Sequence, residues 1–245
     1  MFDWISKLWK NELEIIDFSI LKTDMHSHLI PGIDDGVNTI EESLKIILKL
    51  KELGFTKIIT TPHTMSDVYN NSPQTIRTEC EKIHRTLREL QYDISLEFAS
   101  EYYVDFEFQR KIDQQEFLVF GDNFLLIEFP FIDKPHNIDN IIFNLQLQGY
   151  NVVLAHPERY LYYSMKDYKN LTNKGVFLQL NLLSILGYYS KEVKIKAEKL
   201  IRDNMISFVG TDCHNIRQAE LLKDCFTNPL WHQLSQSGKL LNQGL

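Results

Sequence analysis

The sequence contains few cysteines and no long apolar run, and both absences exclude classes of protein. Three of its 245 residues are cysteine (Cys80, Cys213 and Cys225), and no two of them form a CxxC pair. An odd and widely spaced set favours a reducing compartment over a secreted disulfide scaffold. No stretch approaches the roughly 20 apolar residues of a membrane-spanning helix. We therefore expect a cytoplasmic protein without a membrane span.

The sequence also lacks an excess of basic residues. It has 26 Lys and Arg against 33 Asp and Glu, which gives a formal net charge of −7. Without a basic patch, nucleic acid is not expected as a partner. An acidic protein can still bind phosphate where metal ions supply the positive charge locally.

The first 20 residues lack the apolar core of a signal peptide, because charged residues interrupt their apolar ones. Apolar side chains recur there at helical spacing, at Phe2, Ile5, Leu8 and Trp9. We predict an N-terminal amphipathic extension over residues 1–20, as a short helix that packs on the main domain or meets a partner subunit. A homo-oligomer is therefore an open alternative, whereas the acidic residues weaken the reading as a membrane-surface anchor.

The rest of the chain alternates short apolar runs with longer helical patterns. The runs predict strands at 21–25, 57–61, 94–100, 124–129, 152–155, 176–181 and 206–210. Helices are predicted near 39–53, 72–91, 136–149, 164–174, 190–204 and 215–226. Repeated strand-then-helix units without a linker, an internal repeat or a low-complexity tract predict a single α/β domain over residues 21–245, built as a parallel barrel. An open doubly wound sheet is the alternative.

Residues able to bind metal follow almost every predicted strand. His26 and His28 follow the first strand in DMHSH, and residues two apart in an extended segment point the same way, so both imidazoles can meet one ion. The acids Asp34 and Asp35 come soon after, in GIDDG. The other candidates stand at the ends of later strands: His63, Glu101, Glu128, His156, Asp212 and His214. In a parallel barrel all strands finish on the same face, so these groups are expected to converge.

This ligand set has five histidines and four or five carboxylates, and it requires no thiolate. Such donors suit Mn²⁺, Fe²⁺, Mg²⁺ or Zn²⁺, and nine ligands are too many for one ion, so we predict two or three divalent ions that share bridging carboxylates. Single pieces have ordinary alternatives: Asp34 and Asp35 before a glycine are typical of a turn, and Glu128 alone could be a buried acid in an ion pair. Their conjunction at the strand ends favours a metal-dependent phosphoesterase.

Arginines and tyrosines near these ligands are candidates for substrate contacts. Arg159 stands three residues after a candidate ligand in AHPERY, where its guanidinium could bind a phosphate; the alternative is a surface pair with the preceding glutamate. Arg217 is a weaker candidate of the same kind. Tyr102, Tyr103 and Tyr160 could form an aromatic substrate wall or could equally be packing residues.

A cysteine mechanism is not expected, because cysteine phosphatases need an arginine at C-x5-R spacing. Six residues after the three cysteines stand Thr86, Ala219 and Trp231. Cys213, which lies between two candidate ligands, is therefore interpreted as a small packing residue.

The motifs DMHSH, TPH, AHPERY and TDCHN together resemble the PHP superfamily, named for polymerase and histidinol phosphatase. HSHLIPGIDDG, SEYY, LLIEFP and AHPERY are similar within it to the bacterial capsule-type tyrosine phosphatases, the CpsB/CapC branch. The resemblance runs from about residue 22 to about residue 217 with the motifs in order. The chain departs from the branch in having no clear second arginine match after His214, and its first 20 residues have no counterpart.

The resemblance implies a PHP-type distorted (β/α)7 barrel with three metal ions, usually manganese. It implies one ion on His26, His28, Glu101 and Asp212 with Glu101 bridging, a second on Glu128 and His156, and a third on Asp35, His63 and His214. Arg159 matches the arginine near the phosphate. The branch acts on the tyrosine-rich tail of a kinase that controls capsule or exopolysaccharide export, so the resemblance implies a phosphotyrosine protein as partner.

The expected mechanism is direct hydrolysis by a metal-bridging hydroxide, with Arg159 neutralising charge on the phosphate and Asp212 or an acid beside it handling a proton. Two other functions are left open by the sequence. One is a histidinol-phosphatase-like phosphoesterase, which would share the ligands but need a small pocket. The other is a non-catalytic scaffold that binds a phosphorylated tail.

Overall fold

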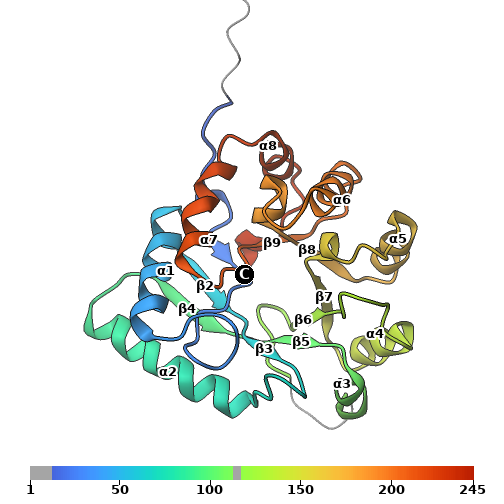
Figure 1. Ribbon diagram of the computed structural model, residues 1–245, viewed down its shortest axis with the longest axis horizontal. Helices are drawn as coiled ribbons and strands as arrows, with labels where there is room; N and C mark the ends of the chain where they lie inside the picture. Colours follow the sequence, from blue (N-terminus) through green and yellow to red (C-terminus); the bar gives the residue numbers. More distant parts are fainter. Residues whose placement is uncertain (1–12, 113–116) are drawn as a thin grey trace, which may run out of the picture.

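The structure is a computed structural model that describes residues 13–112 and 117–245. It is an α/β protein in which helices surround two parallel sheets (Figure 1). The smaller sheet has the strand order β1-β2-β4, with bounds β1 Thr23–Asp24, β2 Lys57–Thr60 and β4 Ser95–Phe98. The larger sheet has the order β3-β5-β6-β7-β8-β9, with bounds β3 His63–Thr64, β5 Glu101–Tyr103, β6 Phe124–Glu128, β7 Asn151–Ala155, β8 Phe177–Asn181 and β9 Phe208–Gly210.

The strands are parallel, as predicted, but the described strands do not form one closed barrel sheet. β2 and β3 come from one extended segment that passes from the smaller sheet to the larger one at Thr61 and Pro62. Pro62 has no N–H for a ladder, so pairing is interrupted there. The described strands therefore form two sheets, and the predicted single barrel sheet is not found among them.

Backbone hydrogen bonds nevertheless join the segments that follow the first and last strands. The Asp212 N–H donates to the His26 carbonyl at 2.8 Å, and the His28 N–H donates to the Cys213 carbonyl at 3.0 Å. These bonds place metal-binding candidates from the two ends of the sequence side by side.

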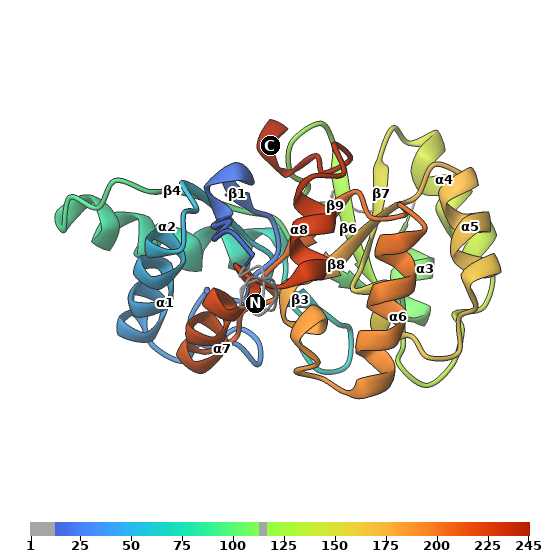
Figure 2. The same ribbon diagram turned by 90° about the horizontal axis from the view of Figure 1, so that it is seen from above.

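Each of the six predicted helical stretches contains a helix. Their bounds are α1 Ile40–Glu52, α2 Pro73–Glu89, α4 Ile138–Leu147, α5 Met165–Asn173, α6 Lys191–Arg202 and α7 Ile216–Leu221. Two short helices were not predicted, α3 Phe106–Lys111 and α8 Pro229–Ser235. Figure 2 shows α1, α2 and α7 on one side of the strands and α3 to α6 on the other. Within the two described ranges, no helix is both long and apolar enough to cross a membrane.

The apolar core has an inner and an outer part. The inner cluster consists of side chains from the strands of both sheets, or from positions directly after a strand, together with Phe120: Met25, Ile59, Ala99, Phe120, Leu126, Val153, Ala155 and Phe208. The outer cluster packs the helices against the sheets. Because both sheets contribute to the inner cluster, they act as one support for the residues at the strand ends.

The described part of the N-terminal extension packs on this core. Phe18 is fully buried, with its ring centroid 5.1 Å from that of Phe55 and 5.2 Å from that of Trp231. The Trp231 indole N–H donates to the Ile16 carbonyl at 2.8 Å. The predicted amphipathic helix with Phe2 to Trp9 lies outside the described residues.

Candidate metal centre

The structure brings all nine candidate ligands together at the carboxyl ends of the strands. His26 and His28 follow β1, and Asp212 and His214 follow β9. The others come from the loop after β1 and from β3, β5, β6 and the end of β7: Asp35, His63, Glu101, Glu128 and His156. Seven of the nine side chains are buried, while Asp35 and His214 reach the surface. The convergence arises because parallel strands finish at the same edge.

Four of these residues form a first group with the spacing of metal ligands. His26 Nε2 lies 3.3 Å from His28 Nε2, 3.4 Å from Glu101 Oε2 and 3.5 Å from Asp212 Oδ1. His28 Nε2 lies 3.5 Å from the same Glu101 oxygen and 3.3 Å from the same Asp212 oxygen. Atoms bound tetrahedrally at about 2.1 Å from one ion are separated by about 3.4 Å, so these five distances are of the size that a shared divalent ion would impose, and His26, His28 and Glu101 form a group able to hold one.

Glu101 extends this group toward a second one. Its Oε1 lies 3.0 Å from His156 Nε2, whereas its Oε2 faces the two histidines of the first group. Glu128 approaches both His156 Nε2 and His63 Nδ1 at 3.5 Å through its two oxygens. Glu101 therefore has the orientation of a bridging carboxylate.

A third group lies nearer the surface. Asp35 Oδ1 is 3.5 Å from both His63 Nε2 and His214 Nε2. The two nitrogens of His63 thus face different groups, because its Nδ1 points toward Glu101 and Glu128. The family resemblance implied His63 with Asp35 and His214 only, and its position between two groups is visible only in three dimensions.

Buried polar atoms without hydrogen bonds indicate that the site is built for ions. His63 Nδ1 and Glu101 Oε2 lie 3.0 Å apart without the geometry of a hydrogen bond, and neither atom has a hydrogen-bond partner among the described residues. An unsatisfied buried polar atom costs roughly 1–3 kcal/mol, more when charged, and a shared cation would satisfy both atoms. The donor set therefore fits divalent metal ions.

Neighbouring polar residues orient the first group. His26 Nδ1 is 2.8 Å from Gln179 Oε1, and His28 Nδ1 is 2.8 Å from Asp34 Oδ2. On the other side, Asp212 Oδ2 accepts hydrogen bonds from the Asn181 amide at 2.5 Å and from the Tyr189 hydroxyl at 3.3 Å. Such contacts fix the ring and carboxylate orientations that metal binding requires.

Two candidate ligands adopt a backbone conformation that is rare outside glycine. His156 has φ = 31° and Asp212 has φ = 51°, and each residue follows a buried strand. Non-glycine residues in this region persist only where the surroundings hold them, and they cluster at functional sites. The hydrogen bond from the Asp212 N–H to the His26 carbonyl helps to keep Asp212 in this conformation.

The charges of the site are balanced by protons when metal is absent. Burial lowers the pKa of His26 and His63, but Glu101 and other carboxylates outweigh burial and raise these values to about 9 and about 10. Burial alone dominates at His156 and lowers its pKa to about 4. Burial and the charge of Glu101 raise the pKa of Glu128 to about 8. Metal ions must therefore displace protons when they bind.

Arg159 stands at the mouth of the centre between two aromatic rings. Its Cζ lies 4.4 Å from the Phe131 ring centroid and 4.7 Å from that of Tyr189, within cation–π range. Its Nη1 is 3.5 Å from Asp212 Oδ2. Glu158, which the sequence offered as an alternative partner for Arg159, is buried and accepts hydrogen bonds from the Asn181 N–H and the Ser184 hydroxyl instead. Arg159 is thus held beside the metal ligands.

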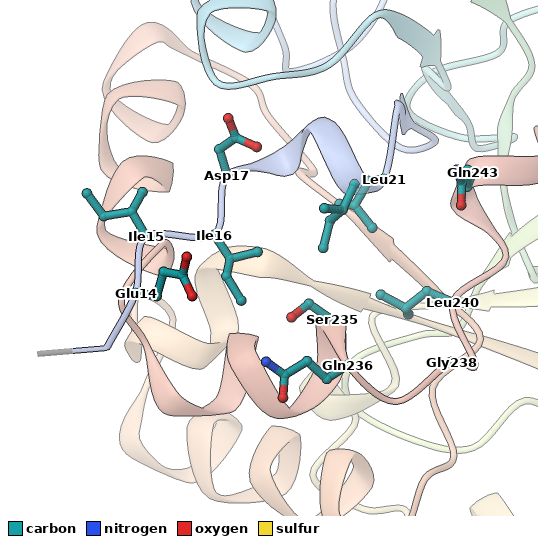
Figure 3. A pocket seen from close by; sticks show the side chains of 11 residues that line it. Glu14, Ile15, Ile16, Asp17, Leu21, Ser235, Gln236, Gly238, Leu240 and Gln243 are labelled. Atoms are coloured by element: carbon teal, nitrogen blue, oxygen red, sulfur yellow. The ribbon is translucent and has the colours of Figure 1, made fainter. Parts of the chain in front are cut away.

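Two cavities differ in their chemistry. One of about 230 Å³ opens at the metal centre and is lined by Asp35, His63, Glu128, Phe131, His156, Arg159, Tyr189, Asp212, His214 and Gln218. A larger one of about 660 Å³ lies between residues 14–21 and 235–243 (Figure 3). Its lining mixes Glu14 and Asp17 with aliphatic and amide side chains and includes no histidine. We therefore place the chemistry in the smaller cavity.

Residues 22–228 match the family described as capsular polysaccharide synthesis, CpsB/CapC. The chain belongs to this family. It is 29% identical over 231 residues to the tyrosine-protein phosphatase YwqE of Bacillus subtilis, covering 89% of this chain and 90% of YwqE. It is 24% identical over 201 residues to the tyrosine-protein phosphatase CpsB of Streptococcus pneumoniae, covering 79% and 83% of the two chains.

A solved structure shares the fold. It comes from the crystal structures of YwqE from Bacillus subtilis and CpsB from Streptococcus pneumoniae, described as unique metal-dependent tyrosine phosphatases. The TM-score is 0.75 at 27% sequence identity, over 91% of this chain and 94% of the other. The sequence resemblance to the CpsB/CapC branch is thereby confirmed.

Three predicted substrate contacts of this CpsB/CapC-family chain are placed elsewhere by the structure. Tyr102 and Tyr160 are buried, and their hydroxyls accept hydrogen bonds from the backbone N–H groups of Leu118 and Phe129. They pack the core and cannot form a substrate wall. Arg217 is exposed on α7 and does not line the cavity.

Tyr103, in contrast, is half-exposed, although it lines a separate small cavity. Its role as a substrate contact stays a prediction.

The sequence analysis missed several residues of the site in this family member. Phe131, Tyr189 and Gln218 line the cavity, and Asn181 and Gln179 support the ligands. A signal for the last two was present: amides at alternate positions of the apolar strand FLQLN point to the same side and need buried partners. Phe131 and Tyr189 lie in loops, where no periodicity marks them.

Proposed function

We propose that this CpsB/CapC-family chain is a metal-dependent protein-tyrosine phosphatase. The observation that carries the proposal is the convergence of nine His, Asp and Glu side chains on one cavity, with Arg159 at its mouth. Relatives named tyrosine-protein phosphatases over most of their length support phosphotyrosine as the substrate class.

For the cofactor, we propose three divalent ions, with manganese as the first candidate and iron, magnesium or zinc as alternatives. Their ligands would be the first group (His26, His28, Glu101 and Asp212), the second group (Glu101, Glu128 and His156) and the third group (Asp35, His63 and His214). When bound, such ions neutralise phosphate oxygens and make hydroxide available at neutral pH.

The protein's own residues would position the phosphate and stabilise its charge. Arg159 lines the cavity within cation–π distance of Phe131 and Tyr189, and its guanidinium N–H groups would bind the phosphate there. Asp212 is ionised, since histidines around it hold its pKa well below the ordinary range against the effect of burial. In this form it has no proton to donate. A tyrosine leaving group has a pKa of about 10 and needs little protonation.

We also propose the finer assignments that the family resemblance implies. Residues 21–245 would act as one PHP-type barrel domain, and the bonds between the segments after β1 and β9 support this arrangement. The substrate would be the tyrosine-rich tail of a kinase that controls capsule or exopolysaccharide synthesis, and the site of action would be the cytoplasm. Residues 1–20 would serve as an extension that contacts the domain or a second copy.

The test is phosphate release from a phosphotyrosine peptide and from histidinol phosphate, each with manganese and with a chelator. Manganese-dependent turnover of the peptide in preference to histidinol phosphate is the expected result. Preference for histidinol phosphate would move the function to small-molecule metabolism. Metal-dependent peptide binding without turnover would instead identify a phosphopeptide-binding scaffold.

A further inference from the structure

Phe131 lines the cavity beside Arg159 at the mouth of the metal centre, and Ile132 follows it in the sequence. Both residues lie in the loop that follows β6, and we call them the apolar ledge. The Phe131 side chain is 43% exposed and the Ile132 side chain is 94% exposed. Exposed apolar surface of this kind gains free energy when a binding partner covers it.

The two residues that precede the ledge are held by hydrogen bonds. The Phe129 N–H donates to the Tyr160 hydroxyl at 3.0 Å, and the Tyr162 hydroxyl donates to the Pro130 carbonyl at 2.6 Å. Phe131 also stacks on the His156 ring with centroids 5.7 Å apart. The exposed side chains therefore project from a preorganised loop, which lowers the entropy cost of binding to them.

The cavity next to the ledge is too small for a peptide. Its volume of about 230 Å³ is below the roughly 300–1,000 Å³ of typical small-molecule pockets, so it accommodates a phosphorylated side chain and little more. Residues on either side of a phosphotyrosine must then lie on the rim. Where that rim is the apolar ledge, an apolar neighbour can bury surface that a polar neighbour cannot.

We propose that the apolar ledge binds an apolar side chain within two residues of the phosphotyrosine in the protein substrate, and so makes the enzyme selective for phosphotyrosines with apolar neighbours. The proposal rests on the phosphatase activity proposed above and adds a specificity determinant to it. Phe131 can both support the site and contact the substrate, because its ring packs against Arg159 and His156 and is still 43% exposed.

The experiment uses phosphotyrosine peptides with serine at all four flanking positions, and four versions in which leucine replaces one of these serines. The ratio of kcat/KM for each peptide to that for p-nitrophenyl phosphate is measured with manganese for the wild-type chain and for Ile132→Ser. Leu147→Ser is the matched control, since Leu147 is 70% exposed at the end of α4, away from the strand ends that form the site.

We expect at least one leucine peptide to exceed the all-serine peptide by about fivefold to tenfold, the effect of burying part of one aliphatic side chain. Ile132→Ser should remove most of this preference, mainly through KM, and Leu147→Ser should keep it. A wild-type chain that hydrolyses all five peptides equally, or a preference that survives Ile132→Ser, would overturn the role of the ledge. Absence of turnover with every substrate would overturn the phosphatase assignment itself.

Discussion

Gly210→Ala is expected to weaken metal binding without removing a single ligand. Gly210 is the last residue of β9, and a Cβ at this position would lie 2.7 Å from the His26 Cβ and 2.9 Å from Gln179 Nε2. Its φ lies outside the left-handed region, so the added methyl group and not the backbone conformation is the cause of strain. The methyl group would push a ligand and its hydrogen-bond partner at the same time.

The size of the effect follows from these distances. Carbon atoms in ordinary contact are about 3.5–4.0 Å apart, so His26 or the strand behind it must move by about 1 Å. Metal–ligand distances tolerate only about 0.2 Å, so His26 Nε2 would leave the spacing of 3.3–3.5 Å that defines the first group. We expect metal affinity to fall by about 10–100-fold, as for the loss of an orienting contact. The overpacking itself should cost about 1–3 kcal/mol in the free energy of unfolding.

The assay is a manganese titration of phosphatase activity, together with the metal content after dialysis and thermal unfolding. Gly244→Ala is the control, because no heavy atom lies within 4 Å of the Cβ it would introduce. If Gly210→Ala folds normally and keeps wild-type metal affinity and kcat/KM, the argument that Gly210 leaves space for His26 is wrong.

Three further predictions concern the site and the core. His63→Ala removes the side chain that faces both Asp35 and Glu101, and it should lower kcat/KM by at least about 100-fold while the circular dichroism spectrum is unchanged; near-normal turnover would contradict the ligand assignment. In metal-free protein, the raised pKa values of His26 and His63 stabilise the fold fully below their unfolded value of 6.5, and this contribution is lost as pH rises through about 9 to 10. Urea unfolding should therefore show stability falling above pH 6.5 without metal, and a fall of equal size with saturating manganese would argue against competition between protons and metal. Trp231→Ala should cost about 3–5 kcal/mol by leaving a cavity against Phe18; a loss under about 1 kcal/mol in urea unfolding would show that the N-terminal segment adds little to the core.

The candidate ligands, and their convergence, could be predicted from the sequence because each one is a local signal. A histidine or carboxylate at the end of an apolar run, as at His63, Glu128 or His156, is visible in a few residues. Strand direction alone then requires these groups to converge. Seven of the nine described strands and the six main helices were predicted for the same reason, since periodicity is a property of neighbouring residues, whereas the short strands β3 and β5 were not predicted.

Contacts between distant segments were decided by tertiary structure alone. Tyr102 and Tyr160 stand directly after candidate site residues in the sequence, which made them candidates for a substrate wall. In the structure both side chains are buried in the core. Phe131 and Tyr189 were not singled out, because only the meeting of two loops places them on either side of Arg159. The sequence by itself determined which chemical groups reach the strand ends, since that depends on order along the chain. The tertiary structure decided their distances, their partners and the rim around them, because these depend on how segments far apart in sequence pack together.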